Sequence, residues 1–261
     1  MKIKSQEIKN LNITAVFSEI DHTLIAAEKM REIFELSEKE RKNSPFFEPS
    51  PSVKILVIPN KQKEIIIEEK RLRVNDNSGK EPNESELEKY FQIVFDSLVD
   101  KTKLTAYGFN YDILVKSEKK INFEELLGKG ILKSLESVSY ILESGVRVLF
   151  EKEEKRYLLQ TSPTEDPYKM RFHLNTHYSS KEIYLKGLQE QLNENYLENT
   201  PGTLLAFSKF KYFLHVIVQS LKSRNSLSLA KCSCFFISLA MIGGRSPLPS
   251  EHFVQATKFP L

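Results

Sequence analysis

The sequence predicts an α+β protein made mostly of antiparallel sheet with packed helices, followed by a compositionally distinct C-terminal tail. Three observations support this fold class. Short β-rich runs follow one another across turn residues, and regular β-α-β alternation is absent. Two helical patterns carry apolar stripes that need a sheet or another helix to cover them. Finally, charged residues become scarce after residue 200.

The formal net charge of +3 over 261 residues combines two unlike parts. Residues 1–200 carry 31 Lys and Arg against 34 Asp and Glu, whereas residues 201–261 carry seven basic residues and one acid, Glu251. We therefore predict an α+β body over 1–200. Its expected elements follow a similar order in 1–120 and 121–200, with hairpin strands before a helix, which favours two similar halves without a residue-level repeat. The remaining segment, 201–261, is apolar and basic, and is expected to begin as a helix and end irregularly.

Composition excludes several classes of protein. Nine Gly and 11 Pro are too few for a collagen-like chain, and 17 Phe with 10 Tyr supply a core. Cys232 and Cys234 stand one residue apart, which excludes a disulfide framework for the body. The first residues lack the apolar stretch of a signal peptide, so the expected location is cytoplasmic.

The first half begins with a strand pattern over 11–20 and a helix pattern over 24–42, with Thr23 or Asp21 as its cap. Three prolines predict a loop over 43–52, and strands are expected over 53–59, 64–69 and 71–74, followed by a loop over 75–82. The clearest helix follows and ends near Asp100, with Asn83 and Glu86 spaced as a capping box. Its apolar stripe comprises Leu87, Tyr90, Phe91, Val94, Phe95 and Leu98.

A long strand is predicted over 103–115. Tyr107, Phe109 and Tyr111 share one of its faces, which is typical of a core beneath a helix, although such a row can also stack nucleic-acid bases. Asn110 lies on the opposite face. Gly108, in the middle of the strand, indicates a bulge or a large group packed across it.

The second half shows weaker patterns. A short helix is expected over 122–129, a strand over 132–143, and a hairpin formed by 146–150 and 156–161. After a loop over 162–167, a strand over 168–178 leads to a helix that includes 185–198, with Ser179 and Glu182 spaced as a capping box.

The tail allows three interpretations. A helix over 203–221 packs on the sheet, residues 203–244 associate with a membrane surface, or part of the tail is not selected sequence of this fold. Its longest apolar run, 232–244, has 13 residues, fewer than the ~20 of a membrane span. We expect residues 1–200 to fold without 222–261.

Signatures of known chemistry are missing from the chain. It contains no G-x-x-x-x-G-K-[ST], G-x-G-x-x-G, G-x-S-x-G or H-E-x-x-H motif, so no metal and no cofactor are expected. His173 and His177 would lie about 13 Å apart along a strand, too far to share one metal ion. The candidate functional site is a polar sheet face that comprises Asn110, Asp112, Arg171, His173, Asn175 and His177.

These features favour a non-catalytic binding or assembly module, acting through sheet edges or the polar face on a protein partner or a second copy. The alternative is a metal-independent enzyme or nucleic-acid-processing protein whose site gathers Asn110, Asp112, His173 and Asn175 from neighbouring strands. A third hypothesis is peripheral membrane association through the tail. The finely mixed, near-neutral charge of residues 1–200 argues against nucleic acid as a partner of the body.

Overall fold

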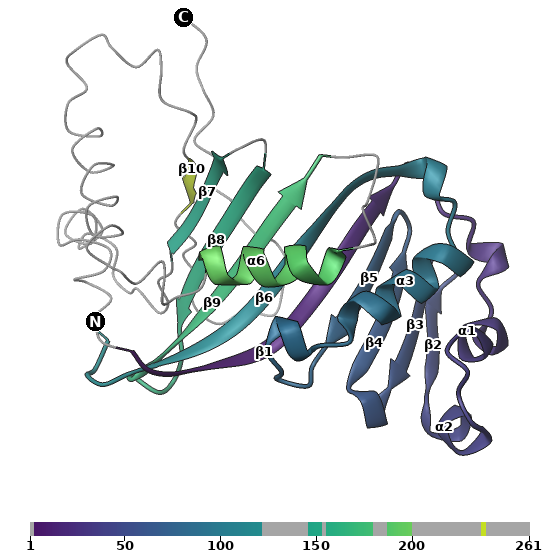
Figure 1. The fold of residues 1–261 in the computed structure, drawn as a ribbon, viewed down its shortest axis with the longest axis horizontal. Coiled ribbons are helices and arrows are strands. Elements are labelled where there is room, and N and C mark those ends of the chain that lie inside the picture. The colour runs from purple at the N-terminus through teal and green to yellow at the C-terminus, as the bar shows by residue number, and fades with distance from the viewer. Residues whose placement is uncertain (1–2, 122–145, 153–154, 180–186, 200–235, 239–261) are drawn as a thin grey trace, which may run out of the picture.

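A computed structural model of the chain describes residues 3–121, 146–152, 155–179, 187–199 and 236–238. These residues form one ten-stranded sheet in which every neighbouring pair of strands is antiparallel, with a few helices packed on it (Figure 1). The predicted fold class is confirmed in this respect, and the protein is dominated by strands.

The elements have the following bounds. The strands are β1 (Ile3–Phe17), β2 (Phe46–Ser50), β3 (Val53–Ile58), β4 (Lys63–Glu68), β5 (Arg71–Asp76), β6 (Leu104–Ser117), β7 (Val146–Lys152), β8 (Lys155–Pro163), β9 (Lys169–Tyr178) and β10 (Phe236–Ser238). The α-helices are α1 (Ala27–Ile33), α2 (Glu38–Asn43), α3 (Leu87–Ser97) and α6 (Leu188–Asn199). The short 3₁₀ turns are η1 (His22–Leu24), η2 (Pro59–Lys61), η3 (Pro82–Glu84) and η4 (Lys101–Lys103).

The two longest strands, β1 and β6, lie side by side in the middle of the sheet. The spatial order is β10-β7-β8-β9-β6-β1-β5-β4-β3-β2. Strand β6 pairs with both β1 and β9, so the sheet continues across the point where the chain passes residue 120. The division at residue 120 stays a prediction.

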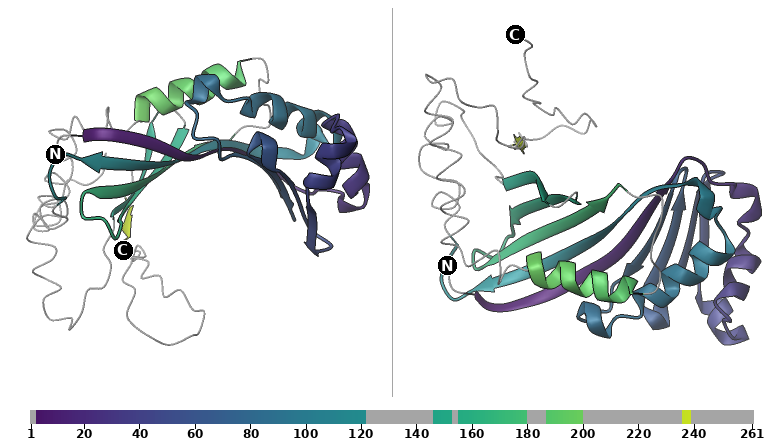
Figure 2. Two further views of the ribbon diagram at one scale, coloured as in Figure 1. Left: turned by 90° about the horizontal axis from the view of Figure 1, so that it is seen from below. Right: turned by 45° about the horizontal axis from the view of Figure 1, so that its top comes forward.

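The sheet is arched, and its helices α1, α3 and α6 lie on the convex side (Figure 2). Their apolar faces and the inward-pointing residues of the strands form one buried cluster. The largest fully buried side chains include Tyr111, Phe17, Phe91 and Phe109. None of the described helices lies on the opposite, concave face.

The helix predicted over 24–42 is interrupted. Turn η1 comes first, capped by Asp21, which accepts a hydrogen bond from the Thr23 amide, so Thr23 is not the cap. Glu35 has a left-handed φ of 51°, which an α-helix cannot continue through, and α1 ends before it. A reciprocal capping box between Ser37 and Glu40 then begins α2.

The proline-rich stretch predicted as a loop contains strand β2, which forms one edge of the sheet. Phe46 and Phe47 pair with Leu56 and Ile55, and the register shifts before Ser50. A proline is tolerated on an edge strand because its missing N–H need not face a neighbour. The prediction of a loop is wrong here, because the local sequence does not show that this segment lies at the edge of the sheet.

The stripe predicted for the helix after residue 83 is confirmed as the buried face of α3, but the predicted capping box is absent. Asn83 lies in turn η3, and Glu86 at the N-cap makes no side-chain capping bond. Instead, the Leu87 amide donates to the Ser85 hydroxyl at 3.2 Å.

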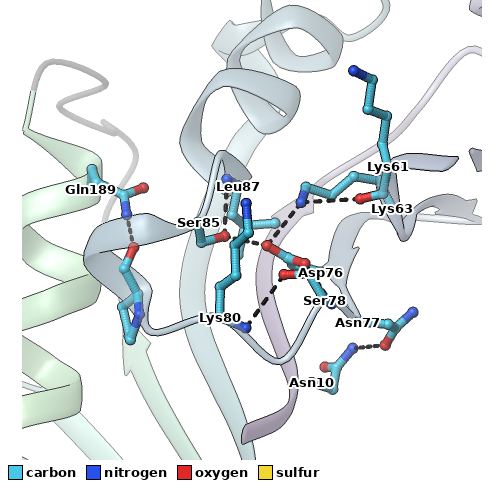
Figure 3. Close-up of polar contacts among 11 residues, drawn as sticks. Asn10, Lys61, Lys63, Asp76, Asn77, Ser78, Lys80, Ser85, Leu87 and Gln189 are labelled. Atoms are coloured by element: carbon cyan, nitrogen blue, oxygen red, sulfur yellow. Dashed lines mark hydrogen bonds and ion pairs between the residues drawn. The ribbon is translucent and has the colours of Figure 1, made fainter.

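A buried polar cluster fastens this helix start to the sheet (Figure 3). Asp76 accepts hydrogen bonds from the Ser85 hydroxyl and, at 2.8 Å, from the Ser78 amide. It also forms an ion pair with Lys63 at 2.9 Å, in which both side chains are almost fully buried. Burial raises the pKa of Asp76, but the hydrogen bonds from Ser85, Lys63 and Ser78 outweigh that effect and leave the pKa below its ordinary value of 3.8.

In the second half the predicted hairpin and the following strand are present as β7, β8 and β9, and the first two are longer than predicted. The last predicted helix is present as α6, whose described turns begin at Leu188. Strand β10, which pairs with β7, had no counterpart in the sequence patterns. The elements predicted over 122–129, 132–143 and 203–221 lie outside the described residues.

Candidate polar site on the concave sheet face

Four asparagines stand side by side at one level of the concave face. Asn75 on β5 is paired with Asn12 on β1, Asn12 with Asn110 on β6, and Asn110 with Asn175 on β9. Residues directly opposite each other in an antiparallel sheet point to the same side, so these four carboxamides form a continuous row. We call Asn75, Asn12, Asn110 and Asn175 the amide row.

Hydrogen bonds run in one direction along three members of this row, whereas Asn75 donates to Glu64 on β4. The Nδ2 of Asn175 donates to the Oδ1 of Asn110, and the Nδ2 of Asn110 donates to the Oδ1 of Asn12, both at 2.6 Å. Asn12 donates onward to Asn10 at 3.0 Å. Each carboxamide has two N–H donors, and these bonds use one of them. The amide row is therefore ordered by its own contacts and retains donor capacity.

An aspartate–histidine pair lies one level away from the amide row. Asp112 is paired with His173 across β6 and β9, and the carboxylate Oδ1 lies 2.7 Å from the ring Nδ1. Both side chains are partly exposed. In a neutral imidazole, Nδ1–H donates to the carboxylate, so the lone pair lies on Nε2, where it can accept a proton or a hydrogen bond.

His177 lies one level away on the other side of the amide row. It is paired with Gly108 on β6 and with Arg156 on β8. Burial, and secondly the positive charge of Arg156, lower the pKa of His177 below 6.5, so the ring is neutral at pH 7.

Gly108 holds β6 and β9 close together at this level. A Cβ built on Gly108 would lie 2.4 Å from the carbonyl oxygen of Thr176. The strand register shows no shift at Gly108, so the predicted bulge is absent. The group that approaches Gly108 is the backbone of the neighbouring strand and not a large side chain packed across it.

These side chains line a hollow of about 720 Å³ on the concave face. Five of the six residues predicted as a polar site lie in its wall: Asn110, Asp112, His173, Asn175 and His177. Arg171 does not line the hollow, although its pairing with Leu114 places it on the same sheet face. The structure thus brings together the four residues of the hypothetical enzyme site, as two hydrogen-bonded pairs.

The hollow also contains residues that sequence reasoning missed: Asn10, Asn12, Thr14, Asn75, Arg71 and Arg73. Their alternation with buried apolar residues is visible in the sequence of β1 and β5. That alternation would have identified the face of each strand, but not that β1 would lie beside β6 and β5 beside β1.

The aromatic row of β6 faces the helices. Tyr107, Phe109 and Tyr111 are buried, and the Tyr111 hydroxyl donates to the Leu192 carbonyl of α6 at 2.7 Å. The core interpretation of this row is confirmed, and stacking of nucleic-acid bases on these three rings is excluded because helix α6 covers them.

In the ranges that the structure describes, no three His, Cys, Asp or Glu side chains gather at a position that could hold a metal ion. Over the same ranges, none of the helices combines the length and the apolar character needed to cross a bilayer. No protein-family model matches the chain, and no curated protein matches it either.

Proposed function

We propose that the protein is a non-catalytic binding module that receives its ligand on the concave face of the sheet. The observation that carries this proposal is the amide row, four carboxamides on four strands inside a hollow of about 720 Å³. Hydrogen bonds join three of them, Asn175, Asn110 and Asn12, across β9, β6 and β1. A sheet face that only meets solvent needs no such cross-strand order, whereas a recognition surface gains from preorganised donors and acceptors.

The architecture supports this location for the site. The amide row crosses the junction of β1 and β6, the two central strands. The same arrangement occurs on each side of that junction. The last strand of a series of hairpins pairs with a central strand, β5 with β1 and β9 with β6. A helix then follows in the chain, α3 after β5 and α6 after β9. We propose that two similar halves meet here and jointly form the binding surface.

A sheet edge is a less favourable place for assembly. Edge strand β2 carries Pro49 and an irregular register, two features by which proteins block pairing with another chain. The other edge, β7, is partly covered by β10. The polar face is therefore preferred over the edges as the surface that meets the ligand.

The test uses four probes: a DNA duplex, a single strand of DNA, an oligoglutamate peptide and a neutral oligosaccharide. Each probe is titrated into the full chain, and hydrogen–deuterium exchange locates the contact. We expect at least one probe to bind saturably and to protect β1, β6 and β9. Asn110→Leu should abolish that binding, while Gln92→Leu on the exposed surface of α3 should leave it unchanged.

Circular dichroism and thermal melting of both variants establish that they fold. Absence of saturable binding by all four probes, or binding that Asn110→Leu leaves intact, would contradict the proposal.

The Asp112–His173 pair favours hydrolysis as a second candidate function. A histidine oriented by a carboxylate, with Nε2 directed away from it, is the usual arrangement of a general base that activates water. Under this hypothesis, Asp112→Asn abolishes turnover of a bound probe but leaves its affinity intact. A non-catalytic binding module predicts no turnover of the probe by either the wild type or the Asp112→Asn variant.

A further inference from the structure

The concave face changes character at the end of the sheet that carries edge strand β2. In the centre of the sheet the concave side chains are mostly polar, whereas β3 presents apolar side chains on both of its faces. Leu56 and Ile58 of β3 lie in the core, and the residues that alternate with them point to the concave side. An antiparallel strand with one solvated face normally alternates apolar with polar residues, so β3 has the pattern of a strand that is covered on both sides.

The concave side chains at this end form a contiguous group that we call the apolar patch: Phe47 on β2, Val53, Ile55 and Val57 on β3, and Ile66 on β4. The Phe47 side chain is 50% exposed. The four aliphatic side chains are partly exposed and belong neither to the core cluster nor to the residues packed against it. The helices that the structure describes lie on the convex side and leave the apolar patch uncovered (Figure 2).

The apolar patch is symmetrical about Ile55. Phe47 and Ile66 are the cross-strand neighbours of Ile55 on its two sides, and Val53 and Val57 lie two residues away along β3. Consider a second copy related by a two-fold axis that runs parallel to β3 above Ile55. Ile55 then meets its own counterpart, and Phe47 meets Ile66 of the second copy. Closed dimers require this kind of self-complementary surface.

The same symmetry keeps like charges apart. Glu64 and Glu68 lie on β4 at the border of the apolar patch, so they face β2 of the second copy. On that strand Ser50 offers a hydroxyl, and Glu48 is already paired with Lys54. A two-fold axis across the strands would instead bring Glu64 of one copy against Glu68 of the other, which charge repulsion disfavours.

The contact involves three strands of each copy, and this limits its strength. Three strand axes span about 10 Å and six residues of a strand about 20 Å. Such an area is well below the roughly 800 Å² per partner of a standard interface, so the association is weak. Arg71 and Arg73 on β5 lie beyond the edge of the second copy and keep their solvent. The polar hollow starts at β5 and therefore stays outside the contact.

We propose that two copies of this chain form a reversible dimer through the apolar patch, with β4 of each copy over β2 of the other. The dimer goes beyond the proposed function, because it uses a different part of the sheet from the ligand hollow. It joins sheet faces, so Pro49 and the irregular register, which block pairing at the β2 edge, do not hinder it. The dissociation constant is expected on the order of 10 to 100 µM.

Sedimentation velocity of the full chain, at concentrations from about 5 to 500 µM, measures the association. The weight-average mass should rise from that of one chain toward that of two. Salt should not dissociate the dimer, because its centre is apolar and contains no ion pair to screen. A wild-type protein that stays monomeric over the whole concentration range overturns the proposal.

Two variants remove the contact by different means. Ile55→Glu brings two carboxylates together at the dimer axis and should abolish association. Phe47→Ser removes an exposed ring from each half of the contact and should weaken association by about tenfold or more. The matched control is Leu24→Ser, which removes a side chain that is 55% exposed on turn η1 and should have no effect.

Circular dichroism and thermal melting establish that each variant folds. Phe47 lies outside the core, so Phe47→Ser keeps the test decisive if Ile55→Glu does not fold. An equal loss of association in the Leu24→Ser control, or none in Phe47→Ser, overturns the proposal.

A charge-swap experiment tests the orientation of the two copies. Phe47→Glu and Ile66→Lys each place a charge against an apolar side chain of the second copy, so each variant alone should be monomeric. In an equimolar mixture, the introduced carboxylate of one chain faces the introduced ammonium of the other, and a heterodimer should form. A mixture that stays monomeric contradicts the placement of β4 over β2.

Discussion

Gly108 is the residue on which the spacing of β6 and β9 depends most directly. Gly108→Ala would place a methyl group 2.4 Å from a backbone oxygen, and backbone cannot rotate away as a side chain does. We expect a loss of about 1 to 3 kcal/mol in the free energy of unfolding, measured by urea denaturation. Lys116→Ala, near the end of the same strand, should change it by less than about 0.5 kcal/mol. Equal stability of the two variants would refute the close approach.

The buried pair of Asp76 and Lys63 makes a second residue-scale prediction. Asp76→Asn leaves the Lys63 ammonium without its counter-charge in the core, which should cost about 3 kcal/mol of unfolding free energy at pH 7. Glu19→Gln breaks an exposed pair with Lys103 and should cost far less, because solvent screens that pair. Chemical denaturation of both variants compares the two losses directly.

Acid should reduce the difference between wild type and Asp76→Asn. The folded-state pKa of Asp76 is lowered, so its carboxylate stabilises the fold fully above the unfolded value near 3.9 and stops doing so as pH falls through the folded value. Unfolding curves between pH 7 and pH 2 should show the two proteins converging at the acid end. A constant difference over this range would show that Asp76 does not titrate as inferred.

At the residue scale, the sequence predicted which side chains point to the polar face of β6 and β9, because strict alternation identifies the two faces of a strand. It left the cap before η1 open between Asp21 and Thr23, and it did not predict the capping role of Ser85. Those bonds depend on where the backbone turns, and neighbouring polar residues such as Thr23 and Asn83 fit the same pattern equally well.

Among the elements, helix α6 is attached to the sheet partly through the Tyr111 hydroxyl. Tyr111 is fully buried, and burial raises the pKa of its phenol well above 10, so the group stays a neutral donor to Leu192. Tyr111→Phe removes the bond and should destabilise the protein by about 1 kcal/mol. Hydrogen exchange in α6 should accelerate, while Tyr168→Phe on an exposed loop should have no effect. Unchanged exchange in α6 would show that apolar packing alone holds the helix.

Elements were predictable where periodicity was unambiguous, as for α3 and β9, and were missed where tertiary position decided the outcome. Strand β2 contains Pro49, and only its place at the edge of the sheet makes that residue acceptable. The candidate site shows the same limit. Half of its hollow comes from β1 and β5. The pairing of β1 with β6, and of β5 with β1, is long-range and local patterns do not encode it.

For the whole molecule, the remaining question is how much the chain after residue 200 contributes to folding. All the buried residues in the described core cluster precede residue 200, the last being Tyr196. From the later chain, the described contribution is β10, three residues paired with β7. The core thus provides no reason for the body to need the tail, whereas the edge of β7 does gain a partner from it.

A chain ending at residue 200 should therefore still unfold in a single cooperative transition, with a melting temperature within a few degrees of the full chain. It should also self-associate more, because removing β10 exposes the backbone N–H and C=O groups along β7. Thermal melting followed by circular dichroism tests the first expectation, and sedimentation velocity at several concentrations tests the second. Loss of cooperative melting would mean that the tail completes the core. If the truncated chain melts cooperatively and stays strictly monomeric, β10 does not protect the edge, because β7 would then remain unpaired with other chains even when β10 is absent.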